Sequence, residues 1–295
     1  MAAPGRVAWP GAARRSLGWP AVSVLEAIVL GIVQGITEFL PISSTAHLRI
    51  VPAFAGWEDP GAAFTAVTQL GTMAAVLLYF REDLWRITRA WTRSLRDRSA
   101  RRELDARLGW YILLGTIPIG IFGLAFKDQI ETGARDLYVI GTALIVLGLV
   151  LLLAEKVGKR DRSIEQLTTR DGVALGFAQA LALVPGVSRS GSTITAGLFL
   201  GLDRESAARF SFLLSIPAVV LSGLLELGSI ASGEEGENVG TAALVIATFL
   251  AFVSGYAAIA LLLRFLATHS TVVFVVYRVA LGVLVLVLVS AGTID

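Results

Sequence analysis

Long apolar stretches, separated by shorter charged or polar segments, dominate the pattern of the chain. Six of these stretches approach the roughly 20 residues that a helix needs to cross a bilayer. They lie at about residues 64–80, 110–126, 137–154, 210–227, 241–263 and 273–291. The pattern predicts an all-α polytopic membrane protein with six transmembrane helices.

The segments between the apolar stretches differ in charge, and the difference predicts an orientation. Segments 81–108 and 155–170 are rich in arginine and lysine, whereas segment 228–240 is acidic. Lysine and arginine gather in cytoplasmic loops, so the first two segments are expected inside and the acidic one outside. The chain from 171 to 209 must then enter and leave the membrane on the same face.

Two further apolar regions are interrupted and are predicted to form re-entrant helix hairpins. The run 22–40 meets Pro41, and the region 172–201 is split by Val184-Pro185-Gly186. Proline ends or kinks a helix, and a broken helix at membrane depth is tolerated where it lines a cavity. Two thin full crossings are the alternative interpretation of residues 171–209.

The two interrupted regions resemble each other at a constant offset of 145 residues. Gly31-Ile-Val-Gln34 recurs as Gly176-Phe-Ala-Gln179, and Ser43 then aligns with Ser188. Each half would hold one hairpin and three crossings, and because three is odd the halves would be inverted. In such folds the site lies where the broken helices meet.

These predictions define one membrane domain with two inverted halves. The domain spans residues 21–291, with the halves at about 22–154 and 172–291. Residues 1–20 would be an N-terminal extension, because no clear signal-peptidase site follows them.

Composition agrees with a membrane protein and limits the chemistry. Of the residues, 55% are hydrophobic and 16% are charged, and the mean hydropathy is +0.73. There is no cysteine, which excludes disulfides and thiolate metal sites, and the two histidines are His47 and His269. The arginine-rich segment 81–108 adjoins a span, so anionic lipid is a better partner for it than nucleic acid.

The first candidate site surrounds the break at Pro41. Its polar residues are Gln34, Glu38, Ser43, Ser44, Thr45 and His47. An ionisable group at the membrane centre costs at least about 2.5–3.5 kcal/mol, so Glu38 is expected to have a partner or a chemical task. His47 follows Ser44 by three residues, which could bring the imidazole toward the hydroxyl. A simple helix cap is the alternative interpretation of this segment.

The second candidate site is the segment from Pro185 to Thr193. Hydroxyl residues surround one arginine there, and its candidate ligand-binding residues are Gly186, Ser188, Arg189, Ser190 and Thr193. The planar guanidinium of Arg189 suits phosphate oxygens, and a helix that restarts after the break adds backbone N–H groups. The segment predicts an anion site, with an arginine that reaches a lipid headgroup as the alternative.

A few polar residues lie elsewhere in the predicted spans. Gln69 is a further candidate for substrate binding, although alone it is typical of a contact between helices. Arg264, His269 and Arg278 lie near span ends and are expected at the membrane interface.

At the two motifs the sequence resembles the undecaprenyl-diphosphatase family, also called the bacitracin-resistance family. That family's first motif has Glu or Gln, three residues, Glu and then Ser-Ser-Thr-x-His, which is matched from Gln34 to His47. Its second motif, Pro-Gly-x-Ser-Arg-Ser-x-x-Thr, is matched at every fixed position from Pro185 to Thr193. The spacing of the spans agrees over about residues 22–291.

The resemblance implies a fold, an activity and a location. The fold is six crossings with two re-entrant helix pairs in an inverted repeat. The activity is hydrolysis of undecaprenyl diphosphate to undecaprenyl phosphate and inorganic phosphate, with Mg²⁺ or Ca²⁺, at the outer side of the bacterial inner membrane. It recycles the lipid carrier of peptidoglycan synthesis and gives bacitracin resistance.

Under this hypothesis Ser44 attacks the terminal phosphorus, His47 is the general base and Arg189 holds the phosphates. Glu38 either orients His47 or binds the metal, so the catalytic set is Glu38, Ser44, His47 and Arg189. The expected substrate-binding residues are Gln34, Ser43, Thr45, Gln69, Gly186, Ser188, Ser190 and Thr193. Direct attack by metal-activated water is an alternative mechanism.

The expected partners are a polyprenyl diphosphate and membrane lipids, without nucleic acid. A homodimer is compatible with the sequence. A polyprenyl-phosphate transporter that uses the same anion site is the alternative function, because inverted repeats with broken helices also occur in transporters.

Overall fold

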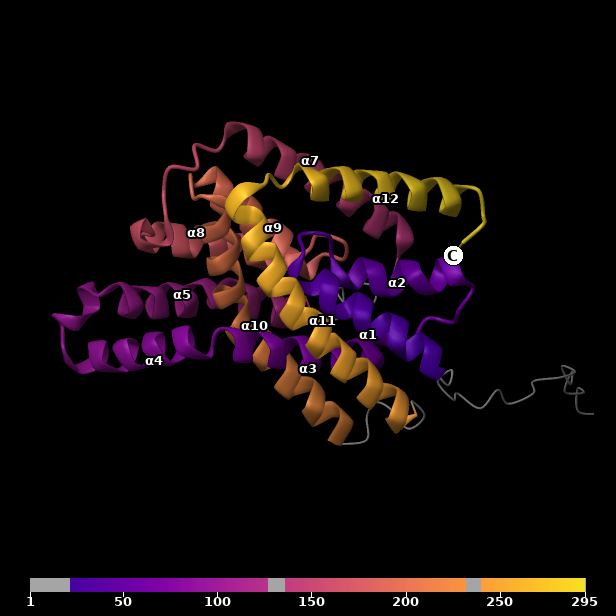
Figure 1. Cartoon of the computed structure of the whole chain (residues 1–295), viewed down its shortest axis with the longest axis horizontal. Helices are drawn as coiled ribbons and strands as arrows, with labels where there is room; N and C mark the ends of the chain where they lie inside the picture. Colours follow the sequence, from indigo (N-terminus) through magenta and orange to yellow (C-terminus); the bar gives the residue numbers. More distant parts are fainter. Residues whose placement is uncertain (1–21, 127–135, 232–239, 295) are drawn as a thin grey trace, which may run out of the picture.

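The structure is a computed structural model that describes residues 22–126, 136–231 and 240–294 (Figure 1). Within these residues it is helical, with one isolated backbone bridge between Arg162 and Leu202 and no strand. The predicted extension at residues 1–20 and most of the segments 127–136 and 228–240 lie outside the described residues.

All six predicted apolar stretches lie in helices. These are α3 (Gly61–Tyr79), α5 (Leu104–Ala125), α7 (Leu137–Val157), α10 (Arg204–Ala231), α11 (Thr241–Thr268) and α12 (Val272–Ser290). Five described helices are long and apolar enough to cross a membrane alone, and α3 qualifies as a sixth together with the helix that follows it. The prediction of an all-α, multi-pass membrane protein is therefore confirmed.

The outer faces of these helices are apolar. Leu124, Leu261 and Val276 are 77%, 64% and 62% exposed, on α5, α11 and α12 respectively. A soluble protein rarely leaves large apolar patches in contact with water, whereas lipid tails solvate them. The exposed faces are thus suited to a bilayer, and the inner faces pack into a core that includes Phe80, Phe210 and Phe212.

The arginine-rich segment after α3 is mostly helical. The chain bends by 72° after α3 and continues as α4 (Arg81–Arg96), followed by a 3-10 turn at Ala100–Arg102. Asp83 in the first turn of α4 accepts from Arg209 of α10 at 2.7 Å. The segment is therefore a charged helix fixed to the start of α10.

Two short helix pairs occupy the predicted hairpin regions. The first is α1 (Val24–Phe39) with α2 (Ser44–Ala55), and the second is α8 (Thr169–Ala180) with α9 (Arg189–Phe199), joined through a 3-10 turn at Leu181–Leu183. Their helices restart at residues 44 and 189, so the 145-residue offset of the sequence holds in the structure.

The two restarts also share an unusual backbone conformation. Ser43 and Ser188, the residues before α2 and α9, have positive φ angles of 76° and 71°. Their hydroxyls accept from the backbone N–H groups of Ala46 at 3.4 Å and Gly191 at 3.1 Å. Each serine therefore caps its helix in the same way.

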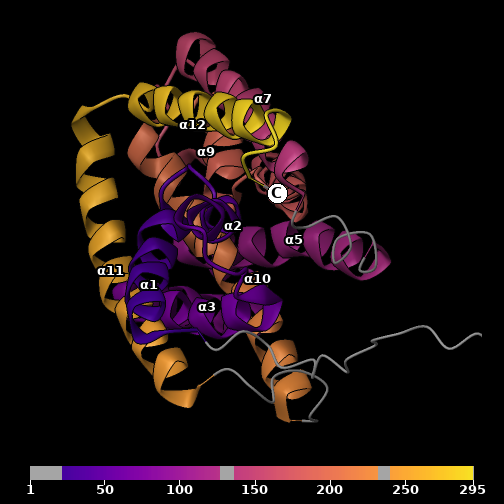
Figure 2. The same cartoon turned by 90° about the vertical axis from the view of Figure 1, so that its right-hand side faces the viewer.

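The pairs pack against different spans through equivalent glycines. α1 lies along α11 (Figures 1 and 2), and α8 lies along α5 (Figure 1). A Cβ added to Gly31 would lie 2.5 Å from the carbonyl oxygen of Ala247, and one added to Gly176 would lie 2.5 Å from Gly115. Small residues at these two points allow the close approach of helix backbones that membrane interfaces use.

Candidate active site

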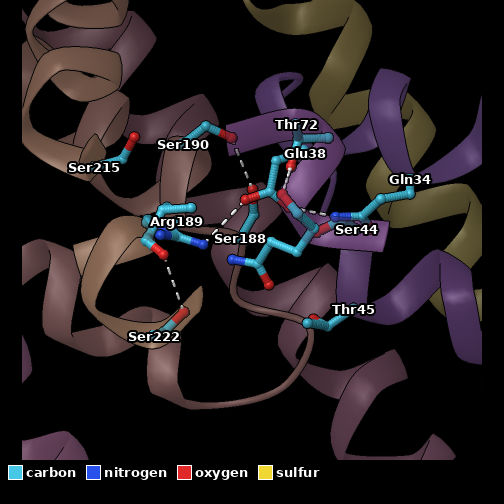
Figure 3. Close-up of polar contacts among 12 residues, drawn as sticks. Gln34, Glu38, Ser44, Thr45, Thr72, Ser188, Arg189, Ser190, Ser215 and Ser222 are labelled. Atoms are coloured by element: carbon cyan, nitrogen blue, oxygen red, sulfur yellow. Dashed lines mark hydrogen bonds and ion pairs between the residues drawn. The ribbon is translucent and has the colours of Figure 1, made fainter. Parts of the chain in front are cut away.

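Glu38 is the centre of a polar cluster formed by both helix breaks (Figure 3). It lies in the last turn of α1, and its side chain is 9% exposed. Ser44 Oγ donates to Glu38 Oε2 at 2.6 Å, and Gln34 Nε2 donates to the same oxygen at 3.2 Å. Arg189 Nη2 donates to Glu38 Oε1 at 3.0 Å. The structure thus brings together an acid, a hydroxyl and a guanidinium from the two predicted motifs.

The breaks place these side chains by local rules. α1 ends at Phe39, before Pro41, so Glu38 lies in its last turn, while Ser44 and Arg189 are the first residues of α2 and α9. Ser190 Oγ donates to the Leu40 carbonyl at 3.0 Å, which ties the second restart directly to the first break. The positive ends of two helix dipoles are therefore near the cluster, as an anion site requires.

Arg189 retains free donors beside Glu38. Its side chain is 20% exposed, and in the described part of the chain only Nη2 of the guanidinium has a hydrogen-bond acceptor. The remaining N–H groups are available to phosphate oxygens, for which the planar fork of arginine is well shaped. The cluster can therefore bind an anion without first losing the ion pair.

No hydrogen bond joins His47 to Ser44, although their spacing had suggested such a contact. Its Nδ1 lies 2.7 Å from the Ser43 carbonyl, and its Nε2 lies 2.7 Å from the Tyr277 hydroxyl. A carbonyl only accepts, so Nδ1 carries the proton and Nε2 of the neutral ring accepts from Tyr277. Ser44 instead donates to Glu38, so the basic group adjacent to the Ser44 hydroxyl is a carboxylate.

The other predicted hydroxyls mostly serve the helix starts. The hydroxyl oxygens of Ser43 and Thr45 are hydrogen-bonded at 3.1 Å. Those of their counterparts Ser188 and Ser190 are hydrogen-bonded at 3.2 Å. Thr193 is fully buried and donates to the carbonyl of Arg189 at 2.7 Å. Thr193 and Ser188 therefore hold the backbone that presents Arg189.

Gly186 lies at the tip of the second break, against α7. Its φ is +84°, and a Cβ there would lie 2.7 Å from the carbonyl oxygen of Ile140. A side chain is excluded by both the conformation and the close approach. The sequence interpretation expected this backbone to lie close to a ligand. In the structure it packs against α7.

A small cavity adjoins the ion pair. Its volume is about 10 Å³, at the lower limit for one water molecule, and it is bounded in part by Glu38 and Arg189. Three hydroxyl residues that the sequence interpretation missed also line it, namely Thr72 of α3 and Ser211 and Ser215 of α10. A usable signal was the four-residue spacing of Ser211 and Ser215 within an apolar span.

Gln69 lines a neighbouring cavity and not the Glu38 cluster. That cavity has a volume of about 100 Å³, lies between α3 and α10, and includes Ser222. Met73 and Val219 line both cavities, so the two are adjacent along these helices. Gln69 therefore lines the cavity that adjoins the one beside the ion pair.

Arg278 is the main error of the sequence interpretation, which expected it at the membrane interface. The side chain is 1% exposed and donates to the carbonyls of Pro41, Gly186 and Val187 at 3.0–3.2 Å. The side chain is buried because α12 passes beside both breaks. The position of Arg278 near the end of a predicted span gave no sign of this path. Arg264, in contrast, is exposed on α11.

The cluster contains oxygen atoms that could be ligands of a hard cation. Gln34 is 1% exposed, and its Oε1 has no hydrogen-bond partner although its Nε2 bonds to Glu38. No group of three His, Cys, Asp or Glu side chains that could hold a metal occurs among the described residues. A carboxylate and an amide oxygen are the kind of ligand that Mg²⁺ and Ca²⁺ take, and a cation there would need further oxygens from an anionic ligand.

A larger cavity lies at the opposite, arginine-rich end of α10. It measures about 760 Å³ and is lined by charged residues of α4, α10 and the segment before α8. Its charges are largely paired, since Asp83 accepts from both Arg86 and Arg209 at 2.7 Å. None of the predicted site residues lines this cavity.

Comparisons with known proteins find a matching family model and several similar proteins. The family model for bacitracin resistance protein BacA matches residues 27–284. An undecaprenyl-diphosphatase of Nocardioides sp. (strain ATCC BAA-499 / JS614) is 56% identical over 273 residues, which cover 92% of this chain and 99% of that protein. Undecaprenyl-diphosphatase 2 of Streptomyces coelicolor is 52% identical over 93% of this chain and 97% of that protein. An undecaprenyl-diphosphatase of Myxococcus xanthus is 57% identical over 93% of this chain and 92% of that protein.

Proposed function

The chain belongs to the bacitracin resistance protein BacA family, and on this premise we propose that it is an integral membrane phosphatase. It hydrolyses undecaprenyl diphosphate to undecaprenyl phosphate and inorganic phosphate. The product is the lipid carrier of peptidoglycan synthesis, and its recycling confers bacitracin resistance. The observation that carries the proposal is the contact of Glu38 with Ser44 on one side and Arg189 on the other.

In the first step Arg189 binds the terminal phosphate through the N–H groups that Glu38 leaves free. Glu38 contacts the guanidinium through Oε1 and Ser44 through Oε2, so the carboxylate can face the nucleophile while Arg189 holds the phosphate. Ser44 Oγ lies 2.6 Å from Glu38 Oε2, within the range of a general base and its nucleophile. Stabilisation of phosphoryl charge by Arg189 is expected to be the largest contribution to the rate.

The bond changes balance over two displacements. Ser44 Oγ bonds to the terminal phosphorus while its proton passes to Glu38. The bond from phosphorus to the bridging oxygen breaks, and undecaprenyl phosphate leaves with that electron pair and the proton from Glu38. Water then attacks the phosphoserine and gives a proton to Glu38, which returns it to Ser44 Oγ as inorganic phosphate departs.

In this mechanism His47 does not react and instead stabilises the backbone at Ser43 through a hydrogen bond. Both ring nitrogens are engaged, one with the Ser43 carbonyl and the other with Tyr277. The imidazole therefore fixes the backbone immediately before Ser44. This role replaces the general-base role that the spacing of His47 and Ser44 had suggested.

A divalent cation, Mg²⁺ or Ca²⁺, is part of the proposal. Glu38 and Gln34 Oε1 are the groups that would hold it, since that amide oxygen is buried without a protein partner. When bound, the cation would neutralise phosphate charge.

We further propose six crossings and two re-entrant helix pairs in an inverted repeat, in the bacterial inner membrane, with a site that opens outward. The equivalent caps at Ser43 and Ser188 support the repeat. The cavity that contains Gln69 and Ser222 supports the outward opening, because it lies toward the ends of α3 and α10 that the charge pattern places outside. The large charged cavity lies at the opposite end, with the arginine-rich segments.

The test is phosphate release from undecaprenyl diphosphate by the purified protein in detergent, with and without a chelator. A transporter that only moves the lipid would release no phosphate, so a negative result with folded wild-type protein would reject the enzyme. Loss of activity on chelation, with recovery on addition of Mg²⁺ or Ca²⁺, is expected if the cation takes part.

The nucleophile is tested separately by acid quenching during turnover of labelled substrate. Label is expected on Ser44, and Ser44→Ala should abolish it together with turnover. Rapid turnover by Ser44→Ala would instead favour direct attack by water.

A further inference from the structure

Arg278 of α12 joins the two helix breaks from inside the molecule. Its Nη1 donates to the Pro41 carbonyl at 3.2 Å, in the first break. Its Nη2 donates to the carbonyls of Gly186 at 3.2 Å and Val187 at 3.0 Å, in the second break, and its Nε lies 3.4 Å from the Leu144 carbonyl. One guanidinium therefore contacts both re-entrant pairs and the neighbouring α7.

Burial of the Arg278 charge is unfavourable in free energy and therefore needs a structural explanation. Arg278 is 1% exposed, and no carboxylate of the described residues lies within ion-pair distance of it. A buried cation without a counter-charge loses hydration that only hydrogen bonds can replace. Here the hydrogen bonds go to carbonyls at the breaks, which the interrupted helices leave without their own N–H partners. The arginine therefore satisfies the backbone at the two places where the helices are interrupted.

Tyr277, the residue before Arg278, also contacts the first break, through His47. The Tyr277 hydroxyl lies 2.7 Å from His47 Nε2, and the rings are stacked with centroids 5.6 Å apart. His47 Nδ1 donates in turn to the Ser43 carbonyl at 2.7 Å. The Ser43 carbonyl sets the tautomer of His47, Tyr277 holds the ring at its other nitrogen, and His47 thus ties Tyr277 to the residue that precedes Ser44.

We propose that Arg278 and Tyr277 are positioning residues that hold the two helix pairs in register. They place Ser44 and Glu38 of the first pair against Arg189 of the second without touching the substrate. The reaction depends on groups from both pairs, and a misplacement of about 1 Å can cost about a hundredfold in rate. This inference rests on the proposed phosphatase function.

The first experiment compares kcat and KM of wild type, Arg278→Gln and Arg278→Lys, per folded molecule after gel filtration in detergent. Arg278→Gln should lower kcat about a hundredfold, by the effect of misplaced groups, while KM changes little because Arg189 is retained. Arg278→Lys should recover part of the loss, since the ammonium keeps the charge and three donors. Arg264→Gln, at an exposed arginine of α11, is the matched control and should match wild type.

The second variant is Tyr277→Phe, which removes one hydroxyl and is expected to disturb folding less than Arg278→Gln, because the buried charge stays. Loss of one hydrogen bond to His47 should lower kcat by about tenfold or less. Tyr138→Phe, at a half-exposed tyrosine of α7, is its control and should leave kcat unchanged.

A distance measurement separates positioning from chemistry. The chain has no cysteine, so Phe54→Cys on α2 and Phe199→Cys on α9, both at exposed positions, allow a pair of spin labels. Arg278→Gln should broaden the distance distribution between the pairs relative to Arg264→Gln in the same labelled background.

Support requires both the lower kcat and the broader distribution. Wild-type kcat per folded molecule, or a lower kcat with an unchanged distribution, would overturn the proposal. An inactive wild type would reject the phosphatase function, while the distance measurement would still show whether Arg278 joins the pairs.

Discussion

At its break the first helix pair places a carboxylate and a hydroxyl, whereas the second pair places an arginine at the equivalent point. Ser44 and Arg189 are both the first residues of their restarting helices, and both follow a serine with positive φ. The backbone is therefore repeated and the chemistry is divided. An inverted repeat can bring the halves of a site together in this way, because each half supplies what the other lacks.

The division extends to a pair of buried glutamines. Gln34 bonds to Glu38, but its equivalent Gln179 has Leu183 at the position equivalent to Glu38. Gln179 is fully buried, and neither its Nε2 nor its Oε1 has a hydrogen-bond partner. The second half thus retains the amide of the repeat without the acid that would pair with it.

The largest expected effect comes from removal of the acid of the first pair. Glu38→Gln keeps the shape of the side chain but loses the proton acceptor of Ser44 and the counter-charge of Arg189. General-base catalysis alone contributes about 10²–10⁴-fold, so we expect kcat to fall about a thousandfold. Phosphate release in detergent measures it, with the exposed Glu58→Gln as the control. A kcat within tenfold of wild type would assign the base elsewhere.

A smaller effect is expected at the arginine of the second pair. Arg189→Lys keeps the charge but loses the planar fork that can bind phosphate while it contacts Glu38. Loss of one such transition-state contact costs about 10²–10³-fold, and we expect kcat/KM to fall by about a hundredfold. Arg170→Lys, at an exposed arginine of α8, should behave as wild type. Equal activity of Arg189→Lys and wild type would mean that a point charge is sufficient.

The local parts of this comparison could be predicted from the sequence, because they depend on neighbouring residues. Pro41 and Pro185-Gly186 mark the breaks, and the 145-residue offset aligns Ser43 with Ser188. Apolar length marks the spans in the same way, since each helix satisfies its own backbone.

The repeat predicted that the two breaks would meet, but the individual contacts between distant segments could not be predicted. The three-residue spacing suggested that His47 would meet Ser44, but Tyr277, 230 residues away, takes one imidazole nitrogen. Arg278 was placed at the interface because it lies near a span end, and only the path of α12 beside both breaks buries it. Sequence spacing limits which side chains can meet within one helix and says little about which helices meet.

Substitution of Gln34 and of Gln179 tests the same difference between the two helix pairs, with a smaller expected effect on kcat. Gln34→Leu removes a hydrogen bond to the carboxylate and should lower kcat about tenfold, the equivalent of about 1.4 kcal/mol. Gln179→Leu removes a buried amide with no partner and should raise the free energy of unfolding by about 1–3 kcal/mol without loss of activity. Urea unfolding in detergent and the phosphate assay measure both variants, each of which is the control for the other. A comparable loss of activity in Gln179→Leu would show that the second amide also serves the reaction.

The smallest effect tests the equivalence of the two backbones. Ser43→Ala and Ser188→Ala each remove a helix cap and should lower the free energy of unfolding by about 1 kcal/mol. Ser43→Gly and Ser188→Gly should cost less, because glycine adopts positive φ without steric strain and offsets part of the lost cap. Ser23 caps α1 with an ordinary φ of −68°, so the same two substitutions there isolate the cap from the strain. The difference between Ala and Gly should be similar at residues 43 and 188 and smaller at 23. An equal difference at all three serines would mean that the positive φ angles store no strain, and unequal values at 43 and 188 would mean that the two restarts are not energetically equivalent.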